Sequence, residues 1–206
     1  MLQSIQASDL TLHDVETKFG LQEVQDLSFF LEWQTNLPEL TEAERQALDQ
    51  VKSNFLYLSK FRMSEESVKL VVLSPLLSMA NFYSPPFRIR TEATVQIALE
   101  DEGKIVRGRI DVLVLKERFW ILVIESKEAG FSLQKAIAQA LAYMMSFPNQ
   151  PAFGFATNGS EFIFLKSIQQ PEPQYACSDL FTLLRRQNEL YSVLGILKRI
   201  GELLKS

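Results

Sequence analysis

The sequence predicts an α/β protein with a mixed central β-sheet flanked by helices. Segments with apolar residues at helical spacing lie towards both ends of the chain, and five strand-like segments lie between them. One helical segment separates the first three strand segments from the last two, which indicates a mixed sheet rather than a purely antiparallel one. The 206 residues are 47% hydrophobic, which is enough for one sizeable core.

The first part of the chain is predicted to be mainly helical. Residues 10–33 have the pattern of short helices or mixed structure. Thr41 and Glu44 have the spacing of a capping box, and apolar residues follow on one helical stripe at Leu48, Val51, Phe55 and Leu58. We interpret residues 1–63 as a helical extension packed on the core, because no flexible linker separates them from residues 64–206, which form the main domain.

A second helix is predicted to begin at Ser64, whose hydroxyl can cap it. It is expected to kink or break near Ser74, because Pro75 cannot donate a backbone hydrogen bond. After Pro86 the hydrophobic period becomes that of strands. Short turns between three such segments predict an antiparallel meander, with strands over residues 87–100, 105–115 and 119–126.

The second half of the chain continues with an amphipathic helix. Ser132 can open this helix and Pro148 should stop it. Asn158-Gly159 is a strong hairpin signal between two further strands. From Ser178 onward the pattern predicts helices.

Two carboxylates and an ammonium lie on the apolar strands of the meander. Strand residues two apart share a face, so Glu125 and Lys127 point the same way. A three-residue turn that pairs Leu115 with Phe119 places Asp111 opposite Val123, with Glu125 diagonal to Asp111 on one face. The predicted register therefore brings the three polar groups together.

Such a group has a specific chemical use. Buried carboxylates are costly unless they are paired or bound to a metal. Mg²⁺ prefers carboxylate oxygens together with water and phosphate, and a lysine beside it can orient the attacking water. The set favours hydrolysis of a phosphodiester, although an ion pair between Asp111 and Lys127 with a solvated Glu125 fits the same spacing.

These motifs together resemble the PD-(D/E)xK nuclease superfamily, and most of all the N-terminal nuclease domain of type I restriction enzyme R subunits. "RIDVLVL" contributes Asp111, and "VIESK" contributes Glu125 and Lys127. "QALAY" contributes Gln139 and Tyr143, which match the Gln-x-x-x-Tyr signature of the RecB-type branch. The resemblance implies a restriction-endonuclease-like fold, DNA as substrate and Mg²⁺ as cofactor, with Mn²⁺ as a substitute.

Further residues follow from this resemblance, which covers residues 64–166. The helix after Ser64 resembles the first core helix, where a Glu commonly joins the metal site, and either Glu65 or Glu66 matches. The resemblance implies catalytic roles for Asp111, Glu125, Lys127 and Gln139, with Asp111, Glu125 and one of the two glutamates as metal ligands. Gln134 and Tyr143 are weaker candidates for contacts with substrate.

The chain also departs from the family. Ile110 replaces the proline of the motif name, which leaves the ligand set intact. R subunits continue into an ATP-driven motor, whereas this sequence has no G-x-x-x-x-G-K-[ST] pattern. A separate motor or specificity protein, and a homodimer, are therefore the partners to consider.

Several function classes are disfavoured by composition. The formal net charge of −4 argues against a general DNA-coating protein. No apolar run is long enough to cross a membrane and no signal peptide is evident, and the single Cys177 suits a reducing compartment, so a cytoplasmic protein is expected. His13 is the only histidine, which excludes sites built on several histidines.

Two alternatives remain open from the residues alone. The fold can serve as a nucleic-acid or protein-binding module of a restriction or defence assembly without catalysis. It can also be a structural protein whose strand acids are all ion-paired. Four arginines on adjacent predicted strands are equally ambiguous, because they can bind phosphate or pair with nearby acids: Arg88, Arg90, Arg107 and Arg109.

Overall fold

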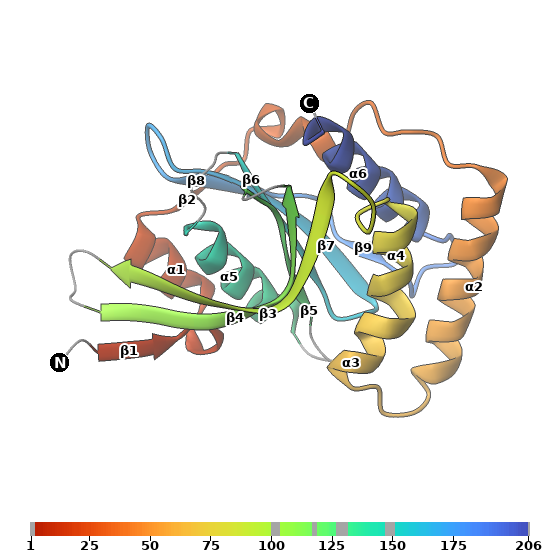
Figure 1. Ribbon diagram of the computed structural model, residues 1–206, viewed down its shortest axis with the longest axis horizontal. Helices are drawn as coiled ribbons and strands as arrows, with labels where there is room; N and C mark the ends of the chain where they lie inside the picture. Colours follow the sequence, from red (N-terminus) through yellow and green to blue (C-terminus); the bar gives the residue numbers. More distant parts are fainter. Residues whose placement is uncertain (1–2, 100–103, 117–118, 127–131, 147–150, 206) are drawn as a thin grey trace.

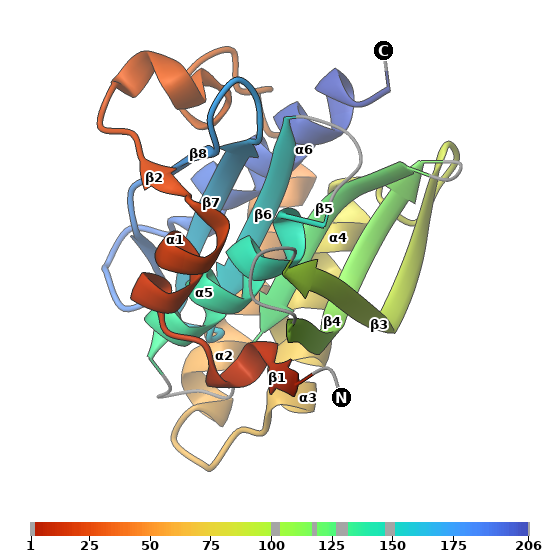
Figure 2. The same ribbon diagram turned by 90° about the vertical axis from the view of Figure 1, so that its left-hand side faces the viewer.

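The computed structural model describes residues 3–99, 104–116, 119–126, 132–146 and 151–205. Within these residues a mixed sheet forms the centre of the molecule, and helices cover both of its faces (Figures 1 and 2). The predicted fold class is confirmed.

The strands of the described sheet follow the order β1-β4-β5-β6-β7-β8-β2, with β3 paired to β4 and β9 paired to β7. Their bounds are β1 (Gln3–Gln6), β2 (Gln22–Glu23), β3 (Phe87–Leu99), β4 (Lys104–Lys116), β5 (Phe119–Ser126), β6 (Ala152–Thr157), β7 (Glu161–Ile168), β8 (Gln174–Cys177) and β9 (Phe181–Thr182).

The helices divide between the two faces of the sheet. On one face lie α1 (Leu12–Phe19) and α5 (Leu133–Met144), together with the short 3₁₀ turn η1 (Ala7–Asp9) (Figure 2). The other face carries the 3₁₀ segment η2 (Leu27–Trp33), α2 (Glu42–Leu58), α3 (Glu65–Val68), the π-helical turn η3 (Lys69–Leu73), α4 (Ser74–Met79) and α6 (Leu190–Leu203). Each face of the sheet therefore has its own hydrophobic core.

The predicted capping box opens α2. The Thr41 hydroxyl accepts a hydrogen bond from the Glu44 backbone N–H at 3.2 Å, and the Glu44 carboxylate accepts one from the Thr41 backbone N–H at 2.8 Å. The apolar stripe then meets the core, where Leu48, Val51 and Phe55 are buried. This helix is confirmed as predicted.

The helix after Ser64 differs from the prediction at Pro75. Ser64 caps it, as expected, by accepting a hydrogen bond from the Ser67 backbone N–H. The chain does not break near Ser74: it continues through a π turn, in which the Ser74 N–H bonds to the Lys69 carbonyl, and Pro75 lies in the first turn of α4. The π turn interrupts the regular helical hydrogen-bond pattern just before Pro75, which accommodates a residue that has no backbone N–H.

The antiparallel meander β3-β4-β5 is confirmed, but its register is not the predicted one. The structure pairs Lys116 with Phe119, shifts after a bulge between Val114 and Leu115, and then pairs Leu113 with Val123. The offset from the prediction is one residue next to the turn and two residues beyond the bulge, so Asp111 and Glu125, which lie beyond the bulge, keep their predicted faces. Continued by one pair, the register sets Asp111 directly across from Glu125.

The β3-β4 ribbon bends sharply at the position of Asp111. Pairing is regular at Thr91–Val112 and at Ala93–Ile110, whereas the pair between them is interrupted. Glu92, which stands there opposite Asp111, has a φ of 55°, a left-handed conformation that is unusual for a residue other than glycine. Figure 1 shows the β3-β4 ribbon turning from α4 towards the opposite end of the molecule, where β1 lies.

The strands β5 and β6 run parallel and are joined through α5, after which β6 and β7 form the predicted hairpin. Gly159 has a φ of +84° in the turn, and the Asn158 side chain accepts hydrogen bonds from the backbone N–H groups of Ser160 and Glu161. Ser132 caps α5 as expected. Pro148, the expected stop, lies outside the described residues.

Two regions that were predicted to be mainly helical also contain short strands. In the first 63 residues β1 pairs in parallel with β4 and β2 pairs with β8, so this part contributes strands to the central sheet. After Ser178 the two-residue strand β9 pairs with β7 before α6 begins. Strands this short have little periodicity, and their partners lie far away in sequence.

The apolar helices of the described residues are core helices. None of them is long and apolar enough to span a bilayer.

Candidate functional site

Four of the predicted site residues line one polar cavity of about 240 Å³. It lies where β1, η1, α3, β4 and α5 meet, and its lining is Gln6, Ser8, Glu65, Gly108, Arg109, Asp111, Gln139 and Tyr143. The predicted residues among these are Glu65, Asp111, Gln139 and Tyr143. They come from three elements that are far apart in sequence, so the fold assembles them.

Asp111 is the buried acid of this cavity. Asp111 is 7% exposed, and it lies at the bend of β4 between the buried residues Ile110 and Val112. Burying a carboxylate in this way is unfavourable without a compensating positive charge or hydrogen-bond donors.

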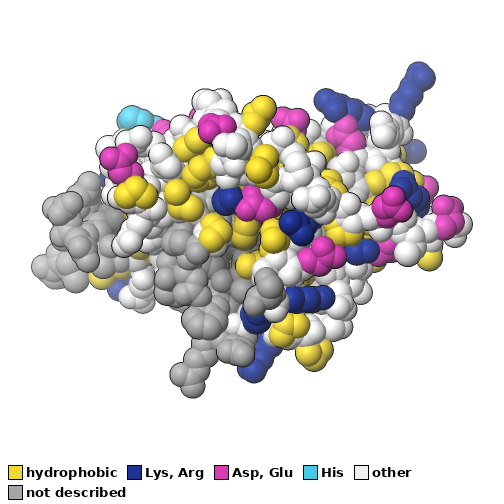
Figure 3. All heavy atoms as spheres, turned by 90° about the horizontal axis from the view of Figure 1, so that it is seen from above, with side chains coloured by type: hydrophobic (Ala, Val, Ile, Leu, Met, Phe, Trp, Pro, Cys, Tyr) yellow, Lys and Arg dark blue, Asp and Glu magenta, His cyan; other side chains and the backbone are white. Residues whose placement is uncertain are grey.

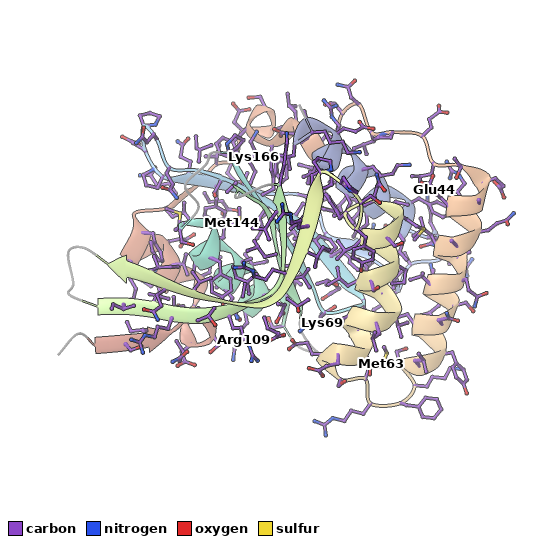
Figure 4. All side chains as sticks on the ribbon, in the orientation of Figure 1. Glu44, Met63, Lys69, Arg109, Met144 and Lys166 are labelled. Atoms are coloured by element: carbon purple, nitrogen blue, oxygen red, sulfur yellow. The ribbon has the colours of Figure 1, made fainter. Side chains whose placement is uncertain are left out.

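Lys69, the first residue of η3, supplies such a charge. Its ammonium nitrogen lies 3.2 Å from Oδ1 of Asp111, 2.6 Å from Oε1 of Glu65 and 3.5 Å from Oε1 of Glu92. Figure 4 shows Lys69 close to the bend of β3 and β4, on the side of the helical layer. Burial alone lowers the pKa of Lys69, but the hydrogen bond to Glu65 and the charge of Asp111 outweigh burial and raise the pKa above its ordinary value. Lys69 is therefore positively charged at neutral pH.

The two candidate glutamates differ in position. Glu65 lines the cavity and contacts Lys69 one helical turn away. The carboxylate of Glu66 is held at the start of the helix, where hydrogen bonds from its own backbone N–H and from Ser64 lower its pKa. The cavity therefore includes Glu65 and does not include Glu66.

Gln139 and Tyr143 form one hydrogen-bonded unit on α5. The Gln139 side-chain amide donates to the Tyr143 hydroxyl at 2.9 Å. That hydroxyl also accepts a hydrogen bond from the Arg109 backbone N–H at 3.1 Å and donates to the Arg109 carbonyl at 3.3 Å. The Gln-x-x-x-Tyr pair thus fastens α5 to β4 two residues from Asp111.

The close approach of Tyr143 to β4 depends on Gly108. A Cβ atom at position 108 would lie 2.4 Å from the Tyr143 hydroxyl oxygen, which is too close for two non-bonded atoms. Glycine at this position allows the ring to reach the backbone of β4.

The other two predicted site residues are Glu125 and Lys127. Glu125 lies at the end of β5, next to Ser126, and its backbone pairs with Ala156 of β6. Lys127 lies outside the described residues. Among the described side chains, no group of three or more His, Cys, Asp or Glu is arranged to hold a metal ion.

Comparison with known proteins places the chain in a family. A family model described as the N terminus of the type I restriction enzyme R protein matches residues 12–173, most of the chain. The chain belongs to this family. The comparison with curated proteins found no match.

One solved structure similar to this R-protein N-terminal chain is a fragment assigned as the HsdR subunit of a type I restriction enzyme from Vibrio vulnificus YJ016. The two are 22% identical with a TM-score of 0.43. The match covers 66% of this chain and 26% of that fragment, so this chain spans about a quarter of the solved one.

Gln134 is not among the residues that line the cavity around Asp111. It lies at the edge of a larger hollow of about 520 Å³, formed by the start of α5 and residues 8–12. Ser8 borders both hollows, so they adjoin.

The arginines of β3 and β4 are exposed, and at least one of them is paired with an acid. Arg109 forms an ion pair with Glu92 at the bend. For this arginine the structure shows pairing with an acid, one of the two expectations from the sequence. Arg88, Arg90 and Arg107 are exposed. On the face seen in Figure 3, acidic and basic side chains are interspersed rather than gathered into one basic surface.

The sequence did not place Lys69 or Glu92 at the site, although pairing of the strand arginines with a nearby acid was one of the two expectations. Lys69 was detectable, because it follows Glu65 by four residues and such pairs meet on a helix. Glu92 gave no such signal, since its place beside Lys69 depends on the bend in β3.

Proposed function

We propose that this chain is a Mg²⁺-dependent nuclease module that hydrolyses DNA phosphodiester bonds. The observation that carries the proposal is a pair of carboxylates, Asp111 on β4 and Glu65 on α3. Both line one polar cavity, and both contact the ammonium of Lys69. Membership in the R-protein N-terminal family supports it, because that family name belongs to restriction enzymes.

The donor set fits a hard divalent cation. Asp111 and Glu65 offer carboxylate oxygens, and the ammonium of Lys69 already occupies the position of a positive charge between them. Glu125 is our candidate for a third carboxylate, because it directly follows Ile124, whose backbone pairs with Val112, the residue next to Asp111. A bound Mg²⁺ would polarise the phosphate and lower the pKa of a water ligand.

The residues of the chain have distinct proposed tasks. Asp111, Glu65 and Glu125 hold the metal, and Lys127 orients the water that attacks the phosphorus. Gln139 lines the cavity while its hydrogen bond to Tyr143 fixes its side chain, so it is placed to hold the substrate. Gln134 is a candidate for contact with a flanking nucleotide in the adjoining hollow.

Cleavage of supercoiled plasmid with Mg²⁺ or Mn²⁺ tests this proposal. Wild type should nick the plasmid, whereas Lys127→Ala and Asp111→Asn should lose activity by about 10²-fold or more. Lys198→Met is the matched control, because Lys198 forms a similar half-buried ion pair with Glu44 far from the cavity; it should cleave as wild type does. Equal activity in wild type and Asp111→Asn would refute the proposal.

Metal binding gives a second test of the same site. Millimolar Mg²⁺ or Mn²⁺ should raise the thermal midpoint of the wild type, because a ligand that binds only the folded state stabilises it. Asp111→Ala should abolish that rise. A rise of equal size in Asp111→Ala would place the metal elsewhere.

The second candidate is a partner-dependent binding module of a restriction assembly. Lys69 already contacts both carboxylates and offsets part of their charge, so the two acids have a cationic partner without a metal. DNA or protein binding that survives Glu125→Ala, with no cleavage by the isolated chain, would favour this candidate. A separate motor or specificity protein is the proposed partner, and sedimentation would show whether the chain is a homodimer.

A further inference from the structure

We propose that Lys69 is the resident counter-ion of the cavity and that a divalent metal and the Lys69 ammonium occupy the site in turn. The inference rests on the proposed function, because it concerns how that metal would enter. It gives Lys69 a positioning role that differs from the role proposed for Lys127.

The geometry shows that the ammonium already lies among the carboxylates a metal would use. Its nitrogen is within 3.2 Å of both Asp111 and Glu65, and its side chain is 19% exposed. Two cations that shared these oxygens would repel each other strongly, because the site is partly withdrawn from water. A metal ion bound to both carboxylates therefore requires the ammonium to move.

A second acidic partner for the Lys69 ammonium lies within reach. Glu92, which also pairs with Arg109, is 3.5 Å from the same nitrogen and its side chain is 44% exposed. Glu92 stands at the bend opposite Asp111, where its backbone is left-handed with a φ of 55°. A small rotation of the lysine side chain would exchange Asp111 and Glu65 for Glu92 and water, and would keep the ammonium near an incoming phosphate.

The consequence is a trade between metal-free stability and metal affinity. With Lys69 in place, its ammonium reduces the repulsion between the two carboxylates and stabilises the metal-free fold. Without it, Asp111 and Glu65 repel each other more strongly, the metal-free fold is weaker, and the metal no longer competes with the Lys69 ammonium.

The test compares Mn²⁺ and Mg²⁺ binding by calorimetry, and thermal midpoints with and without metal, in chelator-treated wild type, Lys69→Met and Lys198→Met. Lys69→Met should lower the metal-free midpoint, bind metal about tenfold or more tightly than wild type, and gain the larger upward shift with metal. Lys198→Met should lower the midpoint and leave metal affinity at the wild-type value, because its partner Glu44 is remote from the cavity.

Metal binding by wild type with equal or weaker binding by Lys69→Met would overturn the counter-ion role alone. Absence of binding and of any midpoint shift in all three proteins would overturn the metal site itself, and the proposed function with it. The two failures are therefore distinguishable.

A second measurement uses the wild-type side chain, in case Lys69→Met does not fold. Lysines are labelled by reductive methylation with ¹³C, and the Lys69 signal is assigned by its loss in Lys69→Arg. Addition of Mg²⁺ should shift this signal, because the ammonium leaves the carboxylates. A Lys69 signal that does not change while the protein binds Mg²⁺ would contradict the proposal.

Discussion

Gly108 and Tyr143 hold together the part of the site that is best defined in the structure. Tyr143 is 1% exposed, so its ring has no room to withdraw from β4. Its hydroxyl satisfies the backbone of Arg109, and its ring lies where a side chain at position 108 would be. The Gln-x-x-x-Tyr pair therefore stabilises the packing of α5 on β4, whatever its role in catalysis.

Substitution of Gly108 by alanine should be destabilising by about 1–3 kcal/mol, because the added methyl group overpacks a site that cannot expand. Urea denaturation would measure the loss. Gly195→Ala is the matched control: a Cβ there meets nothing closer than 3.6 Å, and Gly195 lies within α6. That change should stabilise the protein by about 0.4–1 kcal/mol. Equal stability of Gly108→Ala and wild type would contradict the tight contact.

Cys177 is predicted to be an unreactive thiol. Burial, with a smaller contribution from the charge of Glu23, raises its pKa to about 12. Almost no thiolate then exists at pH 8, and the thiolate is the reactive form. Ellman's reagent should label the native protein very slowly and label one thiol per chain after denaturation. Rapid labelling of the native protein would refute this.

At the scale of elements, local hydrogen bonds fix where helices begin. Capping boxes open both α1 and α2, at Thr11 and Thr41. Each joins two backbone N–H groups to side chains three residues apart, and needs no distant partner. This explains why the start of α2 was predictable.

Thr41→Ala should reduce the free energy of unfolding by about 1 kcal/mol, because the first turn of α2 loses its cap. Thr41→Ser retains the hydroxyl and should lose much less. Chemical denaturation of both variants measures the difference. If both lost the same amount, the methyl group rather than the hydroxyl would be the important part of Thr41.

At the scale of the whole molecule, several carboxylates link distant elements and make stability depend on pH. Asp49 on α2 accepts hydrogen bonds from Asn188 and from Tyr191 of α6, and these lower its pKa below 3.8. Burial raises the pKa of Glu44, but hydrogen bonds from Lys198 and Thr41 outweigh burial, so its pKa falls below 4.5. Both carboxylates hold α2 against α6.

The sign of the pH effect follows from these lowered pKa values. A carboxyl whose folded-state pKa lies below its unfolded value adds stability above the unfolded pKa and loses it as the pH falls. Unfolding free energy should therefore fall as the pH drops through 4.5 and below 3.8.

Urea denaturation between pH 3 and pH 7 measures this fall. The double variant Glu44→Gln, Asp49→Asn should be less stable at neutral pH and should show a shallower decline. A decline as steep as that of the wild type would mean that other groups control acid stability.

Much of the fold was predictable because it depends on patterns among neighbouring residues. The caps at Thr41, Ser64 and Ser132 gave the helix starts, and alternation gave the strands of the meander. The acids at positions 111 and 125 were conspicuous because they interrupt apolar strands, and the family match bears out the resemblance drawn from them. The roles of the individual site residues remain predictions.

The sequence by itself determined the helix starts, the main strands, the mixed sheet and the family, because each depends on residues close together along the chain. Only the tertiary structure decided the register beyond the bulge in β4-β5, the pairing of β1 and β2, and the meeting of Lys69 with Asp111 and Glu92. These depend on a bulge, on a bend and on contacts between distant segments. Such features are fixed by packing, and local sequence carries almost no signal of them.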